Sequence, residues 1–138
     1  MLFGEIITPD ELRIAAATVS GTGGTASFTR HSHGSLRRLK RFLAQHGNDH
    51  GRYNYAGEWH SHPRFALGPS VRDAISMRGI LDEVPYARFA ALLIVRLQLD
   101  QLETRAFVWQ WGCGEAQELP VIPEPAEASV QCRVRGAR

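Results

Sequence analysis

The chain has 138 residues, of which 43% are hydrophobic and 22% are charged, and its formal net charge is only +2. This length and composition predict one soluble globular domain and exclude a disordered chain. The small charge argues against nucleic acid as a partner. No apolar run reaches the roughly 18 residues of a membrane helix.

Two further features bear on the compartment of the protein. No basic region followed by an apolar block precedes the first predicted strand, so we expect no signal peptide. The two cysteines, Cys113 and Cys132, are too few for a disulfide framework and favour a reducing environment. We therefore expect a cytoplasmic protein that is not bound to a membrane.

The N-terminal half is expected to contain three strands and one helix. The predicted strands of this half cover residues 1–7, 12–19 and 53–60. A turn at 8–10 separates the first two strands, and a glycine-containing loop at 20–25 follows them. Ser35 is the expected N-cap of a helix with an apolar stripe, and Gly47 is its expected stop.

The C-terminal half is expected to complete a sheet. The predicted elements here are a helix over 70–81 and strands over 88–97 and 104–111, the two strands joined by a short polar turn. Phe107, Trp109 and Trp111 alternate, so they share one face of the last strand. The sum is an α/β domain, residues 1–117, with a central mixed β-sheet flanked by helices. Residues 118–138 form a proline-containing tail that we expect to be irregular.

The stretch that ends at Asp73 carries the residues with the clearest chemistry. His60 ends a predicted strand and His62 follows two residues later, and on a strand both side chains point to the same face. Asp73 is the third residue of the next helix, from which a carboxylate can point back toward the loop. Two imidazoles and one carboxylate leave a fourth tetrahedral position open, as in catalytic zinc sites.

Each part of this pattern also has an ordinary structural explanation. Histidine pairs on strands are often simply exposed, and a serine three residues before an acidic residue is a common helix start. The chain contains a control, because His31 and His33 repeat the local pattern. No hydroxyl or carboxylate follows them at the equivalent spacing, where Arg41 and Ala44 stand. We therefore expect His31 and His33 to be loop histidines.

Taken together, His60-Ser61-His62, seven residues, Ser70, two residues and Asp73 form a motif that resembles the JAMM/MPN+ zinc metalloprotease family. Glu58-Trp59 before it and Pro63 after it are similar to the small stand-alone prokaryotic members, called JAB or Mov34/MPN/PAD-1 proteins. The resemblance covers about residues 1–111. It implies a single JAMM/MPN-like α/β domain with cytidine-deaminase-like layering.

The resemblance also implies roles for the residues of the motif. His60, His62 and Asp73 would bind Zn²⁺, and Ser70 would donate a hydrogen bond to the oxyanion or its water. The implied reaction is hydrolysis of a peptide or isopeptide amide at the C-terminus of a ubiquitin-like modifier, as in deubiquitinases. Such enzymes occur in bacterial modifier and antiphage-defence systems, and the extended substrate tail is expected to bind by β-strand addition.

The family's general base, a glutamate on an early strand, falls about three residues before Met1 when the pattern is carried over. We expect a late start or trimming of the chain, a partly disabled enzyme that still binds zinc, or a rearranged base. Glu5 lies about 26 Å along the strand from the family position, which is too far. Glu58 lies about 7 Å from His60 by the same rise. It could act as a substitute base, orient a ligand, or only pair with an arginine.

Two other functions are each favoured by one feature of the sequence. An MPN-type binding module without catalysis is favoured by the missing glutamate but not by the intact His60, His62, Ser70 and Asp73. Nucleic-acid binding rests only on a basic cluster in the first predicted helix, which is typical of a solvated face. That cluster consists of Arg37, Arg38, Lys40 and Arg41.

Overall fold

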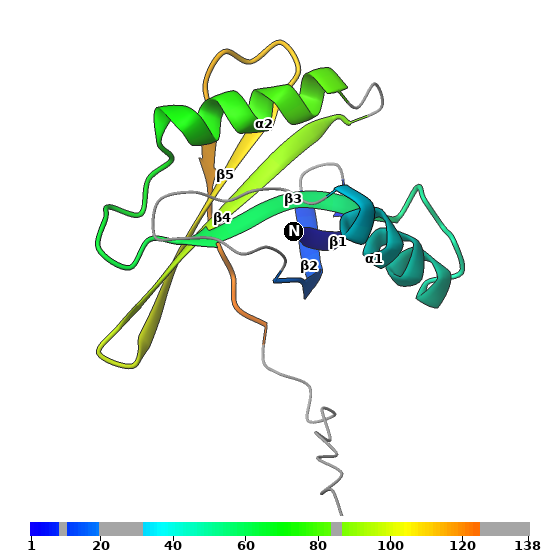
Figure 1. Ribbon diagram of the computed structural model, residues 1–138, viewed down its shortest axis with the longest axis horizontal. Coiled ribbons are helices and arrows are strands. Elements are labelled where there is room, and N and C mark those ends of the chain that lie inside the picture. Colours follow the sequence, from blue (N-terminus) through cyan, green and yellow to red (C-terminus); the bar gives the residue numbers. More distant parts are fainter. Residues whose placement is uncertain (9–10, 20–31, 84–86, 125–138) are drawn as a thin grey trace, which may run out of the picture.

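The computed structural model describes residues 1–8, 11–19, 32–83 and 87–124, and contains eight elements in this part of the chain (Figure 1). They are β1 (Leu2–Thr8), β2 (Glu11–Ala17), α1 (Ser32–Gln45), β3 (Tyr53–Ser61), α2 (Val71–Glu83), β4 (Phe89–Gln98), β5 (Gln101–Gln110) and β6 (Gln117–Leu119). None of the helices among these residues is long and apolar enough to cross a membrane.

The six strands form one curled sheet in the order β2-β1-β3-β4-β5-β6. β3 and β4 are parallel, and the other neighbours are antiparallel. The predicted α/β class with a mixed sheet is therefore confirmed. Two neighbouring parallel strands need a crossover connection, and α2 lies in the connection between β3 and β4. Because the two strands run in the same direction, their carboxyl ends lie side by side at the same end of the sheet.

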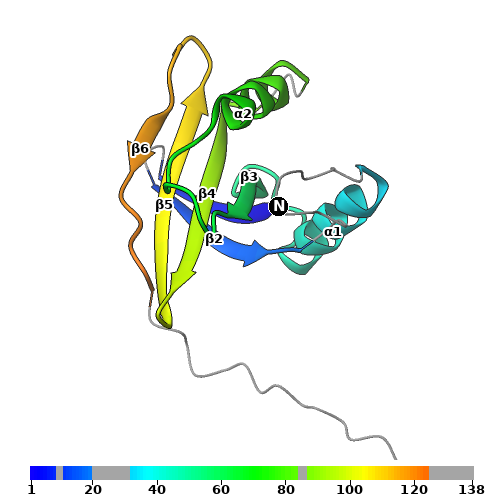
Figure 2. The same ribbon diagram turned by 60° about the vertical axis from the view of Figure 1, so that its left-hand side comes forward.

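Both helices pack on the same side of this sheet (Figure 2). The cluster under α1 contains the buried residues Met1, Phe3, Phe42 and Leu43. The cluster under α2 contains Leu67, Met77, Ile80, Leu81, Ala90, Leu92, Ile94, Phe107 and Trp109. Tyr55 contacts both clusters, so it links them across β3. The predicted shared face of Phe107 and Trp109 is confirmed, whereas Trp111 follows the end of β5 and is 58% exposed.

The largest differences from the expectation are in α1, β5 and the tail, and the other bounds differ by at most two residues. α1 begins at Ser32, three residues before the predicted cap. Its first turn therefore includes Gly34, which the helix tolerates because a glycine weakens a helix by only about 1 kcal/mol. β5 begins at Gln101, because the cross-strand pairs Arg96–Glu103 and Leu97–Leu102 extend the hairpin to its tip. β6 adds a short strand at residues 117–119, where an irregular tail was expected to begin. Several predicted features lie outside the described residues. They are the turn at Pro9-Asp10, the loop at 20–25, His31, the side chain of His33 and the tail at 125–138.

The loop between β4 and β5 has only two residues, Leu99 and Asp100, and both have positive φ, 48° and 61°. This conformation fits the right-handed twist of a two-residue hairpin, where asparagine and glycine are the usual occupants. Leu99 is 91% exposed at this tip, so no packing of its side chain compensates the backbone strain. The hairpin is therefore specified by its strands rather than by its turn.

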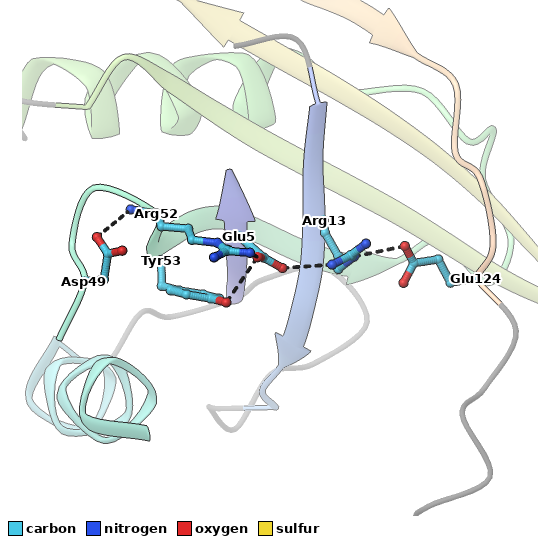
Figure 3. Close-up of polar contacts among 6 residues, drawn as sticks. All are labelled: Glu5, Arg13, Asp49, Arg52, Tyr53 and Glu124. Atoms are coloured by element: carbon cyan, nitrogen blue, oxygen red, sulfur yellow. Dashed lines mark hydrogen bonds and ion pairs between the residues drawn. The ribbon is translucent and has the colours of Figure 1, made fainter. Parts of the chain in front are cut away.

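A buried carboxylate, Glu5, ties the N-terminal strands together (Figure 3). It accepts hydrogen bonds from Arg52 (Nε, 2.7 Å), Tyr53 (Oη, 3.1 Å) and Arg13 (Nη1, 3.0 Å). Arg13 also donates to Glu124, at 3.0 Å, so the segment after β6 is joined to β2. Glu5 pairs with Tyr53 at the start of β3, which places it about 23 Å along that strand from His60. This position agrees with its exclusion as a base.

Glu5 is expected to make the fold sensitive to acid. Burial alone would raise the pKa of the Glu5 carboxyl, but hydrogen bonds from Arg52, Tyr53 and Arg13 hold this pKa below its ordinary value. A lowered folded-state pKa gives stability that is present above the unfolded-state pKa, about 4.3, and is lost as the pH falls through the folded-state value. Replacing Glu5 by glutamine should therefore lower the Tm at pH 7 by several degrees. The difference from wild type should narrow in thermal melts as the pH falls below about 4.3. A difference that stays constant with pH would contradict this origin.

Candidate metal centre

The histidine-bearing end of β3 is positioned by a bulge at Gly57. The register with β1 shifts here, because Leu2 opposes Gly57 whereas Phe3 opposes Tyr55. Gly57 has φ +145°, and a Cβ at this position would lie 1.9 Å from the carbonyl oxygen of Ala91 on β4. The bulge turns Tyr55 and Glu58, three residues apart, to the same face, as their direct hydrogen bond shows. After the bulge, regular alternation carries this face to His60.

The three expected ligands come together at the carboxyl end of β3. The ligand atoms of His60, His62 and Asp73 all lie within 4.8 Å of one another. His60 Nε2 is 2.9 Å from His62 Nε2 and 3.8 Å from Asp73 Oδ1. The two imidazole rings are stacked, with centroids 4.7 Å apart. Strand alternation and the first turn of α2 therefore place these side chains as the sequence predicted.

The hydrogen bonds determine which nitrogen of His62 faces the centre. His62 Nδ1 is 2.8 Å from the carbonyl oxygen of Ala66, which can only accept, so Nδ1 must carry the proton. His62 Nε2 is then the lone-pair nitrogen. In the 2.9 Å contact between the two rings, His60 Nε2 is therefore the donor when both rings are neutral. To hold a metal ion, His60 would have to present Nε2 without its hydrogen, as His62 already does.

Ser70 and Asp73 form the start of α2. The Ser70 backbone N–H and its hydroxyl both donate to Asp73 Oδ2 at 2.7 Å, and the Asp73 N–H donates to Ser70 Oγ at 3.2 Å. The helix-capping explanation is thus correct, and it leaves Asp73 Oδ1 directed toward His60. The Ser70 hydroxyl hydrogen is used by Asp73 in this arrangement. To donate to an oxyanion, the hydroxyl must exchange this bond.

The charge state of His60 suits a ligand. Burial lowers the pKa of the His60 imidazole, and the nearby Asp73 carboxylate opposes this effect without overcoming it. His60 is therefore neutral at pH 7, the form that coordinates a metal. The donor set is two imidazole nitrogens and one carboxylate oxygen. This is a set that zinc accepts, with a fourth position left for water.

Glu58 lies in the same region but is engaged by other groups. It is 6% exposed, and its Oε1 accepts a hydrogen bond from the Tyr55 hydroxyl at 2.8 Å. Its Oε2 lies 3.3 Å from the amine of Met1. The Glu58 charge also favours the protonated form of His60, although less than Asp73 does. The contacts with Tyr55 and Met1 hold the Glu58 carboxylate in place, and its influence on His60 is electrostatic.

Three contributors to the site were missed by the sequence analysis. Tyr55 is displaced onto the Glu58 face by the bulge, which alternation alone does not predict. The Ala66 carbonyl that holds His62 is a backbone group, so its residue type carries no signal. Arg96 donates to the carbonyl of Phe65 in the same loop at 3.3 Å, and no motif marks it.

Comparison with family models, with curated proteins and with solved structures returns no match for this chain.

Proposed function

We propose that the protein is a zinc-dependent hydrolase of peptide or isopeptide amides, of the JAMM/MPN+ type that its motif resembles. The observation that carries this proposal is the convergence of His60, His62 and Asp73 within 4.8 Å. We also propose that the mixed sheet and its two helices form a JAMM/MPN-like domain with cytidine-deaminase-like layering. The proposed substrate is the C-terminal tail of a ubiquitin-like protein or its conjugate.

The chemistry divides between the ion and the side chains. Zinc bound at such a site would lower the pKa of its water to about 7, far below that of bulk water, and would polarise a substrate carbonyl. His60 and His62 supply neutral nitrogens, with the His62 proton held on Nδ1 by Ala66. Asp73 supplies Oδ1, while its other oxygen is kept in place by Ser70. Ser70 is the donor proposed for the developing oxyanion.

The proton-transfer step needs a base, for which Glu58 is the candidate in this chain. It lies two residues from His60 on the same strand face, but the Tyr55 hydroxyl and the Met1 amine contact its carboxylate. To accept a proton from water, Glu58 would have to exchange one of these contacts. The same observation supports a second candidate function, in which the site binds zinc and the domain is a binding module of the MPN type.

The experiment that separates the two functions is hydrolysis by zinc-loaded protein. The substrates are ubiquitin with a fluorogenic amide on its C-terminal glycine and a linear ubiquitin fusion. We expect amide cleavage that a zinc chelator suppresses and that re-added zinc restores. Zinc binding without cleavage, together with measurable binding of uncleaved ubiquitin, would support the binding module instead. Activity that survives removal of zinc would contradict the proposal.

Replacing Ser70 by alanine is expected to separate metal binding from catalysis. The Ser70 backbone N–H still donates to Asp73 Oδ2, so zinc should be retained. Loss of one oxyanion donor typically costs about 2.7–4 kcal/mol, so kcat should fall on the order of 100-fold. Loss of the N-cap should also lower the free energy of unfolding by about 1 kcal/mol. The measurements are zinc per chain, kcat with the fluorogenic substrate, and urea unfolding. Wild-type kcat would remove Ser70 from the mechanism.

A further inference from the structure

The orientation of His62 depends on the loop that follows it. Its Nδ1–H donates to the Ala66 carbonyl at 2.8 Å, and this bond aims Nε2 at His60 and Asp73. Hydrogen-bond partners of this kind fix the tautomer and ring orientation of a ligating histidine. The position of the Ala66 carbonyl is therefore a condition for the metal centre.

Two anchors hold that carbonyl, one on each side of it along the chain. On the C-terminal side, Leu67 is 8% exposed and packs in the cluster under α2. On the N-terminal side, Arg96 Nη1 donates to the Phe65 carbonyl at 3.3 Å. The Phe65 side chain itself is 64% exposed, so it does not anchor the loop through burial. Arg96 is thus the polar anchor of this segment.

Arg96 is well placed to act as a fixed point. It lies on β4, and Glu103, its cross-strand partner on β5, binds its guanidinium through Nε and Nη2. The residue before it, Val95, accepts the backbone N–H of His62 at 2.9 Å. Adjacent residues of β4 therefore hold both the backbone of His62 and the loop that orients its ring.

We propose that Arg96 is a positioning residue for the metal ligand His62, acting through the Phe65–Ala66 segment. This inference rests on the proposed metal-binding function of the site. The hydrogen bonds of the Arg96 guanidinium go to Glu103 and to the Phe65 carbonyl, so its effect on His62 is indirect. Its contribution is to hold the Ala66 carbonyl in a position where the oxygen accepts a hydrogen bond only from the Nδ1–H tautomer of His62.

The test compares Arg96→Met with wild type and with Arg105→Met. Arg105 on β5 is the matched control, because it is also a strand arginine whose guanidinium is bound by a glutamate of the neighbouring strand, Glu118 on β6. Zinc affinity is measured by competition with a chromogenic chelator. The tautomer of His62 is read from ¹⁵N NMR of histidine-labelled, metal-free protein at pH 8. Arg96→Met should raise the zinc dissociation constant about 10-fold, as the loss of an outer-shell partner does.

The expected spectrum of Arg96→Met shows His62 with both tautomers populated, whereas wild type and Arg105→Met show Nδ1–H alone. Both variants should lower the Tm by no more than about 4 °C, since each breaks one surface ion pair. An unchanged dissociation constant in Arg96→Met would overturn the inference, and so would weaker binding with an unchanged His62 tautomer. If wild type itself binds no zinc, the proposed function fails, and the tautomer comparison still decides the role of Arg96.

Discussion

Replacing His62 by alanine is expected to abolish stoichiometric zinc binding, which wild type should show at about one ion per chain. His62 Nε2 is one of three atoms that could together hold a metal ion, and it lies 2.9 Å from Nε2 of His60. Loss of an outer-shell partner alone weakens metal binding by 10–100-fold, so loss of a ligand should weaken it by more than about 100-fold. The measurement is zinc per chain by elemental analysis after reconstitution and dialysis.

The control for this experiment is His50→Ala. His50 is exposed in the turn before β3, away from the cluster, so its loss should leave zinc binding unchanged. Equal zinc content in all three proteins would show that the ion binds elsewhere. Absence of zinc from reconstituted wild type would remove the metalloprotease proposal for this chain and leave only a binding module that does not use the metal.

Replacing Gly57 by alanine is expected to be the most damaging single change to the fold. The added Cβ would lie 1.9 Å from the Ala91 carbonyl oxygen in the neighbouring strand, and φ of +145° is strained for any other residue. Backbone strain of this kind costs about 1–3 kcal/mol, and overpacking adds about 1–3 kcal/mol. Their sum is comparable with the 5–15 kcal/mol that stabilises a typical domain. Urea unfolding should therefore show a loss of about 2–6 kcal/mol or no folded state.

Gly79→Ala is the matched control for that substitution. Gly79 lies within α2, and a Cβ there would meet nothing within 4 Å. Alanine is the better helix former, so this variant should gain about 0.5–1 kcal/mol. A mild effect of Gly57→Ala, similar in size to that of Gly79→Ala, would contradict the role of the bulge.

The parts of this structure that follow local rules were predictable from the sequence. Alternation and turn residues located the five longer strands, and capping and apolar spacing located both helices to within a few residues. The convergence of His60, His62 and Asp73 was predictable because these residues are close in sequence and lie at the end of a strand and in the next helix turn. Local periodicity alone is enough to bring such residues together.

The remaining features depend on contacts between distant segments. The bulge at Gly57 is set by the approach of β4, and one glycine in a strand does not reveal which carbonyl it faces. Arg96 acts through a backbone oxygen 31 residues away, which leaves no pattern in the residue types. Glu5 was assessed only as a base, because its partner Arg52 is 47 residues distant. The sequence alone does not show which of the distant charged side chains will form an ion pair.

The ion pair between Arg13 and Glu124 has a consequence for self-association. β2 and β6 are the two outer strands of the sheet, and Figure 3 shows Glu124 on the side of β2 away from β1. An outer strand with unpaired backbone groups invites pairing with another chain, and a charged side chain held on it discourages such pairing. Glu5 and Glu124 fix the Arg13 guanidinium from two sides. We therefore expect the ion pair with the segment after β6 to disfavour pairing of β2 with a second chain.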